Sequence, residues 1–98
     1  MGSRVLIRPK AEANLYSAAS WYQDQEPGST LWVELLAEFD AVVSQLCAFP
    51  ESAPVYEGRV RRALLRRFPY TLYYVVEDQQ IVVITFLAMK LELRSGTR

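Results

Sequence analysis

The chain has 98 residues, of which 51% are hydrophobic, and its acidic and basic residues balance at 11 each. A chain of this length predicts one domain, residues 1–98, with a thin core. One cysteine, Cys47, and no histidine exclude an intrachain disulfide and remove the commonest general base and metal ligand. We therefore expect neither a cofactor nor a metal ion. Residues 1–9 lack the apolar stretch of a signal peptide, and no apolar run approaches the roughly 18 residues that span a bilayer. These features predict a cytoplasmic protein without membrane contact.

Charge is distributed unevenly along the chain. Residues 11–58 contain no Lys or Arg and eight acidic residues, whereas residues 59–98 contain eight Lys or Arg and three acidic residues. Such asymmetry favours charged partners, although two solvated faces that complement each other would give the same pattern. The apolar content has two readings as well: a well-filled core, or an apolar groove that a partner covers.

The first third of the chain predicts a short strand followed by a helix. Residues 4–8 form the strand, and Pro9 ends it because proline has no amide hydrogen for a ladder but suits the first turn of a helix. Ala11, Leu15, Ala18, Ala19 and Tyr22 then recur at helical spacing and define one apolar face. The Pro27-Gly28 pair ends this helix.

A second helix follows after a short loop. Ser29 or Thr30 is expected to cap its amino terminus. The apolar positions then keep helical spacing until Phe49-Pro50: Trp32, Leu35, Leu36, Phe39, Val42, Val43 and Leu46. Because the connecting loop is short, the two helices are expected to lie antiparallel as a hairpin.

The second half of the chain changes to the period of strands. Residues 51–58 are expected to form a loop, and residues 59–68 a basic strand with a bulge, because the alternation there is imperfect. Residues 71–77 predict the next strand, Asp78-Gln79 a hairpin turn, and the continuous apolar run 81–88 a central strand buried on both faces. The result is an α+β fold in which a helix hairpin packs on a small, mostly antiparallel sheet, with the first strand at an edge beside the meander.

The arginines of the basic strand are the main candidates for binding a partner. Strict alternation would place Arg62 and Arg66 on one face, and Arg59, Arg61 and Arg67 on the other. One face would bind phosphate or an acidic partner, unless arginine only keeps an edge strand soluble. Trp21 is either an exposed anchor for a partner or a cover for the hairpin loop against Trp32. The candidate partner-binding set is Trp21, Arg59, Arg61, Arg62, Arg66, Arg67, Lys90 and Arg94.

The order and spacing of several short motifs resemble the ParE/RelE toxin superfamily, and its ParE branch in particular. The resemblance covers residues 4–88 and depends on Pro9, Ala11 and Leu15, Trp21-Tyr22, Pro27-Gly28, the helix that ends at Phe49-Pro50, Arg61, Phe68-Pro69-Tyr70, Tyr73-Tyr74 and Ile81-Val82-Val83. It implies a bacterial toxin that is neutralised by an antitoxin encoded beside it. Members similar to ParE inhibit DNA gyrase, whereas members similar to RelE cleave messenger RNA on the ribosome.

An RNA-cleaving site without histidine would need Arg, Lys and Tyr for charge stabilisation and proton transfer, which leaves Arg62, Tyr70, Tyr73 and Lys90 as catalytic candidates. Thr71 and Leu91 stand where the RelE branch implies arginines. The resemblance therefore favours protein–protein inhibition of gyrase, with an antitoxin helix or strand covering the apolar and basic sheet surface. The alternatives are a ribosome-dependent endonuclease and a degenerate, non-toxic binding module from a mobile gene array. A homodimer or a toxin–antitoxin hetero-oligomer is expected.

Overall fold

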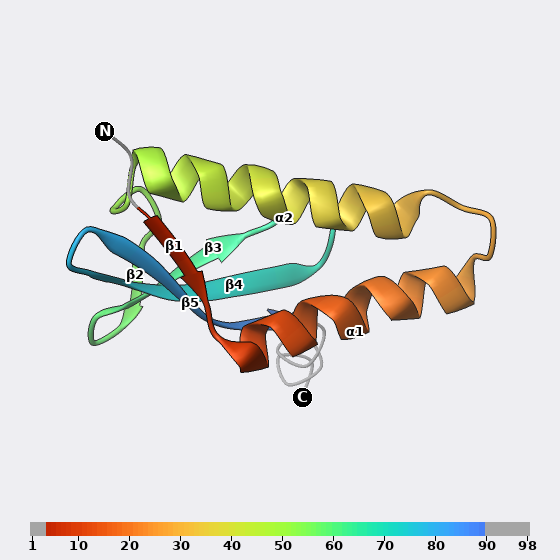
Figure 1. Ribbon diagram of the computed structural model, residues 1–98, viewed down its shortest axis with the longest axis horizontal. Helices are drawn as coiled ribbons and strands as arrows, with labels where there is room; N and C mark the ends of the chain where they lie inside the picture. Colours follow the sequence, from red (N-terminus) through yellow and green to blue (C-terminus); the bar gives the residue numbers. More distant parts are fainter. Residues whose placement is uncertain (1–3, 90–98) are drawn as a thin grey trace, which may run out of the picture.

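The computed structural model describes residues 4–89, so the predictions for Lys90, Leu91 and Arg94 lie outside the described residues. Two helices and four strands follow one another in the predicted order, and a fifth, short strand lies after the second helix (Figure 1). Their bounds are β1 Arg4–Ile7, α1 Pro9–Gln25, α2 Leu31–Ala48, β2 Val55–Glu57, β3 Val60–Leu64, β4 Tyr70–Glu77 and β5 Gln80–Ala88.

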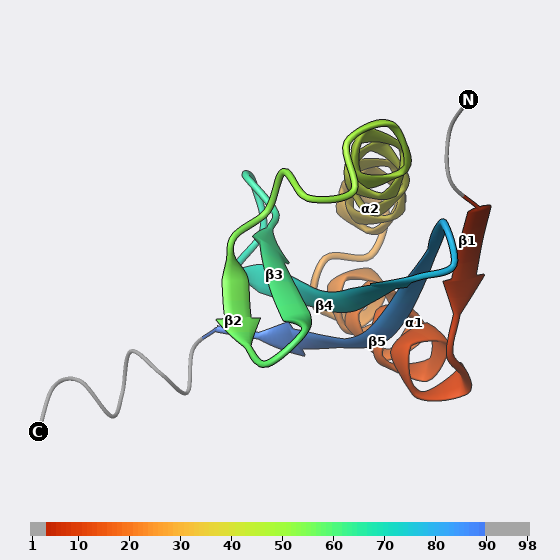
Figure 2. The ribbon, with the colours of Figure 1, turned by 90° about the vertical axis from the view of Figure 1, so that its left-hand side faces the viewer.

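The strands form one five-stranded sheet in the order β1-β5-β4-β3-β2. β1 pairs with β5 in parallel, and all other neighbours are antiparallel. β1 and β2 therefore lie at opposite ends of the twisted sheet (Figure 2). The predicted fold class and the edge position of the first strand are confirmed, as is the burial of the central strand on both faces at Ile81, Val82 and Val83.

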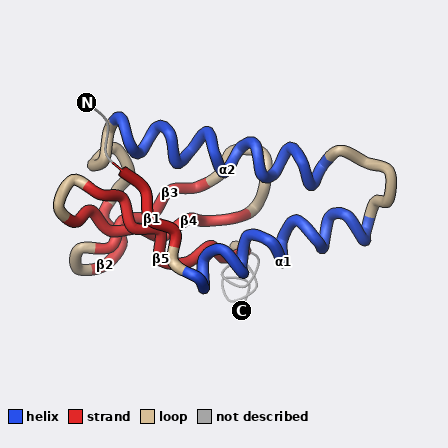
Figure 3. The backbone as a smooth tube through the Cα atoms, in the orientation of Figure 1, coloured by secondary structure: helices blue, strands red, loops and turns tan. Residues whose placement is uncertain are grey.

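The helices form the predicted antiparallel hairpin, and its tip extends beyond the ends of the strands (Figure 3). Proline at position 9 starts α1, and the buried side chains of this helix are the predicted ones: Ala11, Leu15, Ala18 and Ala19. At the start of α2 the Ser29 hydroxyl oxygen accepts a hydrogen bond from the Leu31 amide at 3.0 Å. Thr30 does not cap, because its hydroxyl donates instead to the Glu34 carboxylate. No helix in the described part of the chain is long and apolar enough to cross a membrane.

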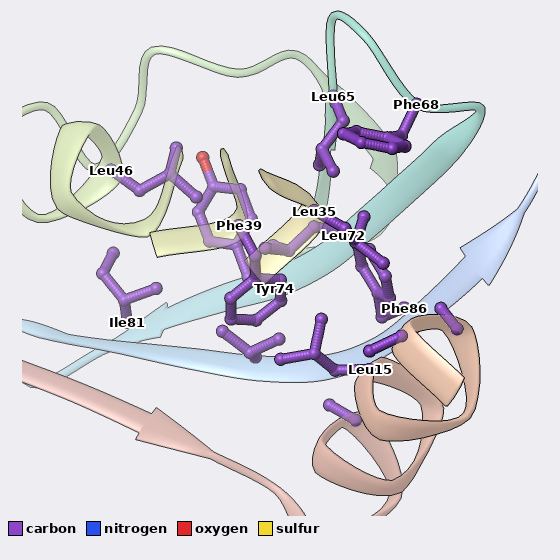
Figure 4. Close-up of a cluster of buried hydrophobic side chains, with 14 of the residues drawn as sticks. Leu15, Leu35, Phe39, Leu46, Leu65, Phe68, Leu72, Tyr74, Ile81 and Phe86 are labelled. Atoms are coloured by element: carbon purple, nitrogen blue, oxygen red, sulfur yellow. The ribbon is translucent and has the colours of Figure 1, made fainter. Parts of the chain in front are cut away.

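The core lies between the helix hairpin and one face of the sheet (Figure 4). Leu35 and Phe39 of α2 point toward Leu72 and Tyr74 of β4, and all four are at most 1% exposed. Phe39 also meets Phe86 of β5 edge to face, with ring centroids 5.3 Å apart. Burying a large apolar side chain stabilises a fold by roughly 1.5–3 kcal/mol, so these contacts fix the face on which the helices sit.

Two sequence predictions are wrong on the β2 and β3 side of the sheet. Residues 51–58 are not only a loop, because Val55–Glu57 pairs with β3 as strand β2. The predicted strand over residues 59–68 ends at Leu64, because the Leu65 amide turns to donate to the Tyr70 carbonyl at 3.1 Å.

The predicted bulge lies in a neighbouring strand. Val55 pairs with Arg61 and Glu57 with Val60, so two steps along β2 match one step along β3, and the extra residue is Tyr56. A second irregularity falls between Tyr73 and Tyr74, which pair with Thr85 and Val83 of β5. The predicted hairpin turn at Asp78-Gln79 is confirmed, and both residues adopt positive φ, 50° and 60°.

Candidate partner-binding surfaces

Arg61 and Arg62 are neighbours in β3, and their side chains lie on opposite faces of the sheet. Arg61 pairs with Tyr74, whose side chain lies in the core under the helices. The Arg61 guanidinium donates to the Ala53 carbonyl at 2.7 Å and to the Glu51 carbonyl at 3.3 Å. The Tyr74 hydroxyl donates to the Pro50 carbonyl at 2.8 Å, and burial raises the pKa of this phenol. Arg61 and Tyr74 therefore fasten the segment after α2 to the sheet, which is a structural role.

Arg62 belongs to a group on the open face, the sheet face that the helices do not cover. It pairs with Tyr73, and its guanidinium lies 4.8 Å from the centroid of the Tyr56 ring. The rings of Tyr56 and Tyr73 meet edge to face at 5.2 Å. We call Tyr56, Arg62 and Tyr73 the aromatic–arginine cluster. It offers a positive charge and two π faces on one surface.

Tyr70 does not join this cluster. It is an even number of residues from Tyr74 along β4 and so shares the helix-covered face. Its ring stacks on Phe86 with centroids 5.0 Å apart and an interplanar angle of 8°. Burial, and to a lesser extent Tyr22, raises its pKa, so this phenol stays protonated at neutral pH and is a poor base. Of the four catalytic candidates, only Arg62 and Tyr73 come together among the described residues.

Arg66 and Arg67 lie on the loop between β3 and β4 instead of on a strand face, so the predicted division into two faces is wrong for these two arginines, although it is right for Arg61 and Arg62. Both backbone amides donate to the Glu38 carboxylate of α2, Arg66 at 2.5 Å and Arg67 at 3.3 Å. The Arg67 guanidinium also pairs with Glu34. Hydrogen bonds from Thr30 and then Arg67 lower the pKa of Glu34. Two carboxylates of α2 therefore hold this loop while the Arg66 side chain stays exposed.

The remaining described candidates are exposed on separate elements. Arg59 precedes β3, donates to the Val76 carbonyl at 3.2 Å and lies 3.7 Å from the Glu77 carboxylate. Trp21 is 53% exposed and touches Tyr22 edge to face at 5.0 Å. Within residues 4–89, no group of three His, Cys, Asp or Glu side chains is placed to hold a metal ion.

A groove of about 790 Å³ runs between α2 and the β2–β3 side of the sheet. Small side chains from both walls leave the space open, among them Ala37, Ala41, Ala53 and Ala63. Charged residues that line it include Glu34, Glu38, Arg66 and Arg67. This groove was not predicted from the sequence, although Ala37 and Ala41, one helical turn apart, give a signal for a shallow helix face.

The fold places the chain in a known structural class. The chromosomal ParDE toxin–antitoxin system from P. aeruginosa superposes with a TM-score of 0.75 at 18% identity, covering 88% of this chain and 95% of that one. The toxin–antitoxin complex RelBE2 from Mycobacterium tuberculosis gives 0.60 at 16% identity, covering 90% and 99%. The isolated E. coli RelE toxin gives 0.59 at 16% identity, covering 98% and 97%. At such identities the likeness shows a ParE/RelE fold.

The sequence narrows this class to a family. A family model described as the ParE toxin of the type II toxin-antitoxin system, parDE, matches residues 5–90. No curated protein matches the chain significantly. Because the family match spans most of the chain, the chain belongs to the ParE toxin family and is a toxin of the type II toxin–antitoxin class.

Proposed function

We propose that this toxin acts by binding and inhibiting DNA gyrase, and not by cleaving RNA. One observation carries the proposal: Tyr70 is separated from Arg62 and Tyr73 by the thickness of the sheet. Thr71, at a position where the RelE branch implies an arginine, is only 4% exposed. Proton transfer and charge stabilisation need groups that converge on one reacting phosphate. The described candidates do not converge in this way, which favours a toxin that works through protein contacts.

The proposed antitoxin covers the groove beside α2. Its floor is built from alanines and aliphatic side chains, and its rim carries Arg66 and Arg67. An amphipathic helix with an acidic edge fits such a groove, because its apolar face fills the floor and its carboxylates meet the arginines. The resulting assembly is a toxin–antitoxin hetero-oligomer.

The test of gyrase inhibition is a supercoiling assay. Purified chain is added to gyrase, ATP and relaxed plasmid, and we expect supercoiling to fall as the toxin concentration rises. Trp21→Ala, which removes the exposed aromatic anchor, is expected to raise the inhibitory concentration at least fivefold. Tyr16→Ala is the matched control, because Tyr16 lies on the same helix and is 59% exposed. Unchanged supercoiling at a tenfold excess of folded toxin over gyrase refutes the proposal.

The aromatic–arginine cluster supports a second candidate, a ribosome-dependent endonuclease. Tyrosine rings stack on unpaired bases, and arginine binds the phosphates between them. In this case the chain cleaves ribosome-bound messenger RNA in a purified translation system, and Arg62→Ala or Lys90→Ala abolishes the cleavage.

Growth of cells separates both activities from a non-toxic binding module. The chain is induced in bacteria without a partner gene, and surviving colonies are counted. A loss of colonies with DNA-damage markers supports gyrase as the target, whereas translation arrest supports the ribosome. Normal growth at confirmed expression supports the non-toxic alternative.

A further inference from the structure

A second hollow, of about 600 Å³, lies where α2 ends. It is bounded by Ala48 and segment 49–52 on one side, and by Val76 and Gln79 of the β4–β5 hairpin on the other. The end of α2 and this hairpin lie at the end of the molecule opposite the tip of the helix hairpin (Figure 1). The hollow and the groove beside α2 are neighbours, because Ser52 lines both.

Segment 49–52 forms a fixed wall of this hollow. The Phe49 amide donates to the Gln45 carbonyl at 2.8 Å, and the Tyr74 hydroxyl donates to the Pro50 carbonyl at 2.8 Å. Every residue of the segment takes part in a hydrogen bond through its backbone: Phe49, Pro50, Glu51 and Ser52. A wall that is already ordered loses little conformational freedom when a ligand binds.

The fixed wall presents an aromatic ring and a carboxylate to the hollow. Phe49 is 63% exposed although it is a large apolar side chain. Glu51 is exposed and is the one charged residue in the lining of the hollow. Neither of the two ion pairs found among residues 4–89 involves Glu51. Its carboxylate is therefore available to a cation from another molecule.

The carboxyl end of α2 adds to the negative character of the hollow. The last turn of this helix contains no basic side chain. Within residues 4–89, no amide or side chain outside the helix donates to the carbonyls of Cys47 or Ala48. Such carbonyls carry partial negative charge and favour a nearby lysine or arginine. Because Ala48 lines the hollow, the end of α2 and Glu51 act on the same space.

An arginine side chain matches all of these groups. Its planar guanidinium stacks on an aromatic ring, pairs with a carboxylate through two hydrogen bonds and donates to carbonyl oxygens. Its aliphatic stem covers apolar surface such as that of Val76. The neighbouring groove differs, because Arg66 and Arg67 line it and favour an acidic segment. The two surfaces therefore select opposite charges.

We propose that the hollow at the end of α2 binds an arginine side chain of a partner protein, presented by an extended segment with an apolar residue on each side. The guanidinium lies on the Phe49 ring and pairs with Glu51, and the apolar neighbours pack against Pro50 and Val76. The volume of the hollow is in the range of sites that hold more than one side chain, which leaves room for these neighbours. The site is separate from gyrase inhibition and from the acidic helix proposed for the groove.

The test titrates the full chain, made by cell-free synthesis with ¹⁵N labelling, with the capped peptide Leu-Arg-Leu. We expect the amide signals of Phe49, Glu51 and Gln79 to shift and saturate, and those of Ala37 and Ala41 in the groove to stay in place. The capped peptide Leu-citrulline-Leu has nearly the same shape without the charge, and should bind at least fivefold more weakly. The capped peptide Leu-Glu-Leu should shift none of these signals.

Three variants of the protein connect this preference to the hollow. Glu51→Gln keeps the shape of the side chain and removes its charge, so it should bind the arginine and citrulline peptides equally. Glu57→Gln changes another exposed glutamate, on β2 and outside the hollow, and should keep the fivefold preference. Phe49→Leu keeps an apolar side chain without the ring, and should weaken binding of the arginine peptide at least threefold. Unchanged amide signals elsewhere show that each variant is folded.

Three results would overturn the inference. The first is equal binding of the arginine and citrulline peptides to the unmodified chain, and the second is an unchanged preference in Glu51→Gln. The third is a shift of the same amide signals with protein concentration alone, which would assign the hollow to a second copy of this chain. A toxin that fails to inhibit gyrase gives the same expected titration, so this inference and the proposed function fail separately.

Discussion

The two faces of the sheet use neighbouring residues of the same strands for different purposes. On the helix-covered face, Tyr74 is fully buried and Arg61 is bound to backbone carbonyls. On the open face, Arg62 and Tyr73 are cross-strand partners, and both contact Tyr56, which is 49% exposed. The residue types are the same on both faces, an arginine and a tyrosine. The difference is therefore made by what packs on them: the helices and the α2–β2 segment cover one face and do not cover the other.

Within β3 and β4, residues on the helix-covered face therefore contribute to stability, whereas residues on the open face are available to bind a partner. A buried hydroxyl or guanidinium must find a protein partner, because losing water without one is costly. Arg62 and Tyr73 are only half-buried, so they keep hydrogen-bonding capacity for a partner molecule. Changes on the helix-covered face should alter the free energy of unfolding, and changes on the open face should alter the binding of a partner at the aromatic–arginine cluster.

The largest expected effect comes from the core. Phe39→Ala removes a ring that is 1% exposed and packs on Phe86, and should destabilise the fold by about 3–5 kcal/mol. A domain of this size loses roughly 4–8 °C in Tm per kcal/mol. Thermal unfolding followed by circular dichroism measures the change. Tyr73→Ala on the open face is the control and should cost less than about 1.5 kcal/mol. Equal losses for the two variants would contradict the division into two faces.

The second-largest expected effect is the loss of stability when Arg61 is replaced, compared with the loss when its neighbour Arg62 is replaced. Arg61→Ala leaves the Ala53 and Glu51 carbonyls without their charged donor and should destabilise the fold by about 1.5–3 kcal/mol. Arg62→Ala removes a cation–π contact with an exposed ring and should cost less than about 1 kcal/mol. Urea unfolding measures both. A larger stability loss from Arg62→Ala would exchange the roles of the two residues.

Much of the fold was predictable because it depends on local periodicity. Leu35 and Phe39 were predicted from their helical spacing, and both are buried in α2. One buried apolar face is enough to specify a helix. The strand Val55–Glu57 was missed because it is three residues long, lies between Pro54 and Gly58, and exists only through pairing with β3. Short segments of this kind depend on a neighbour that the local sequence does not encode.

The candidate site was harder to predict for a related reason. The role of Arg61 depends on the positions of two backbone carbonyls. Every residue has such a carbonyl, so a pattern of residue types does not show which carbonyls the guanidinium will bind. Arg66 and Arg67 were placed on a strand because alternation was extended past Leu64, where Glu38 of α2 draws the chain into a loop. The contact of Arg62 with Tyr56 likewise depends on β2, a strand that the local sequence did not reveal.

The smallest expected effect lies at the turn between β4 and β5, which belongs to neither face. Gln79 adopts φ 60°, a left-handed conformation that glycine adopts without steric cost. Gln79→Gly should therefore stabilise the fold by about 0.5–1 kcal/mol, measured as an increase in the urea midpoint at constant slope. Gln80→Gly, one residue later and within β5, is the control and should destabilise by a similar amount. Since the turn touches neither the aromatic–arginine cluster nor the groove, Gln79→Gly should leave gyrase inhibition and antitoxin binding unchanged. A change in either would mean that the stability of the hairpin also affects recognition.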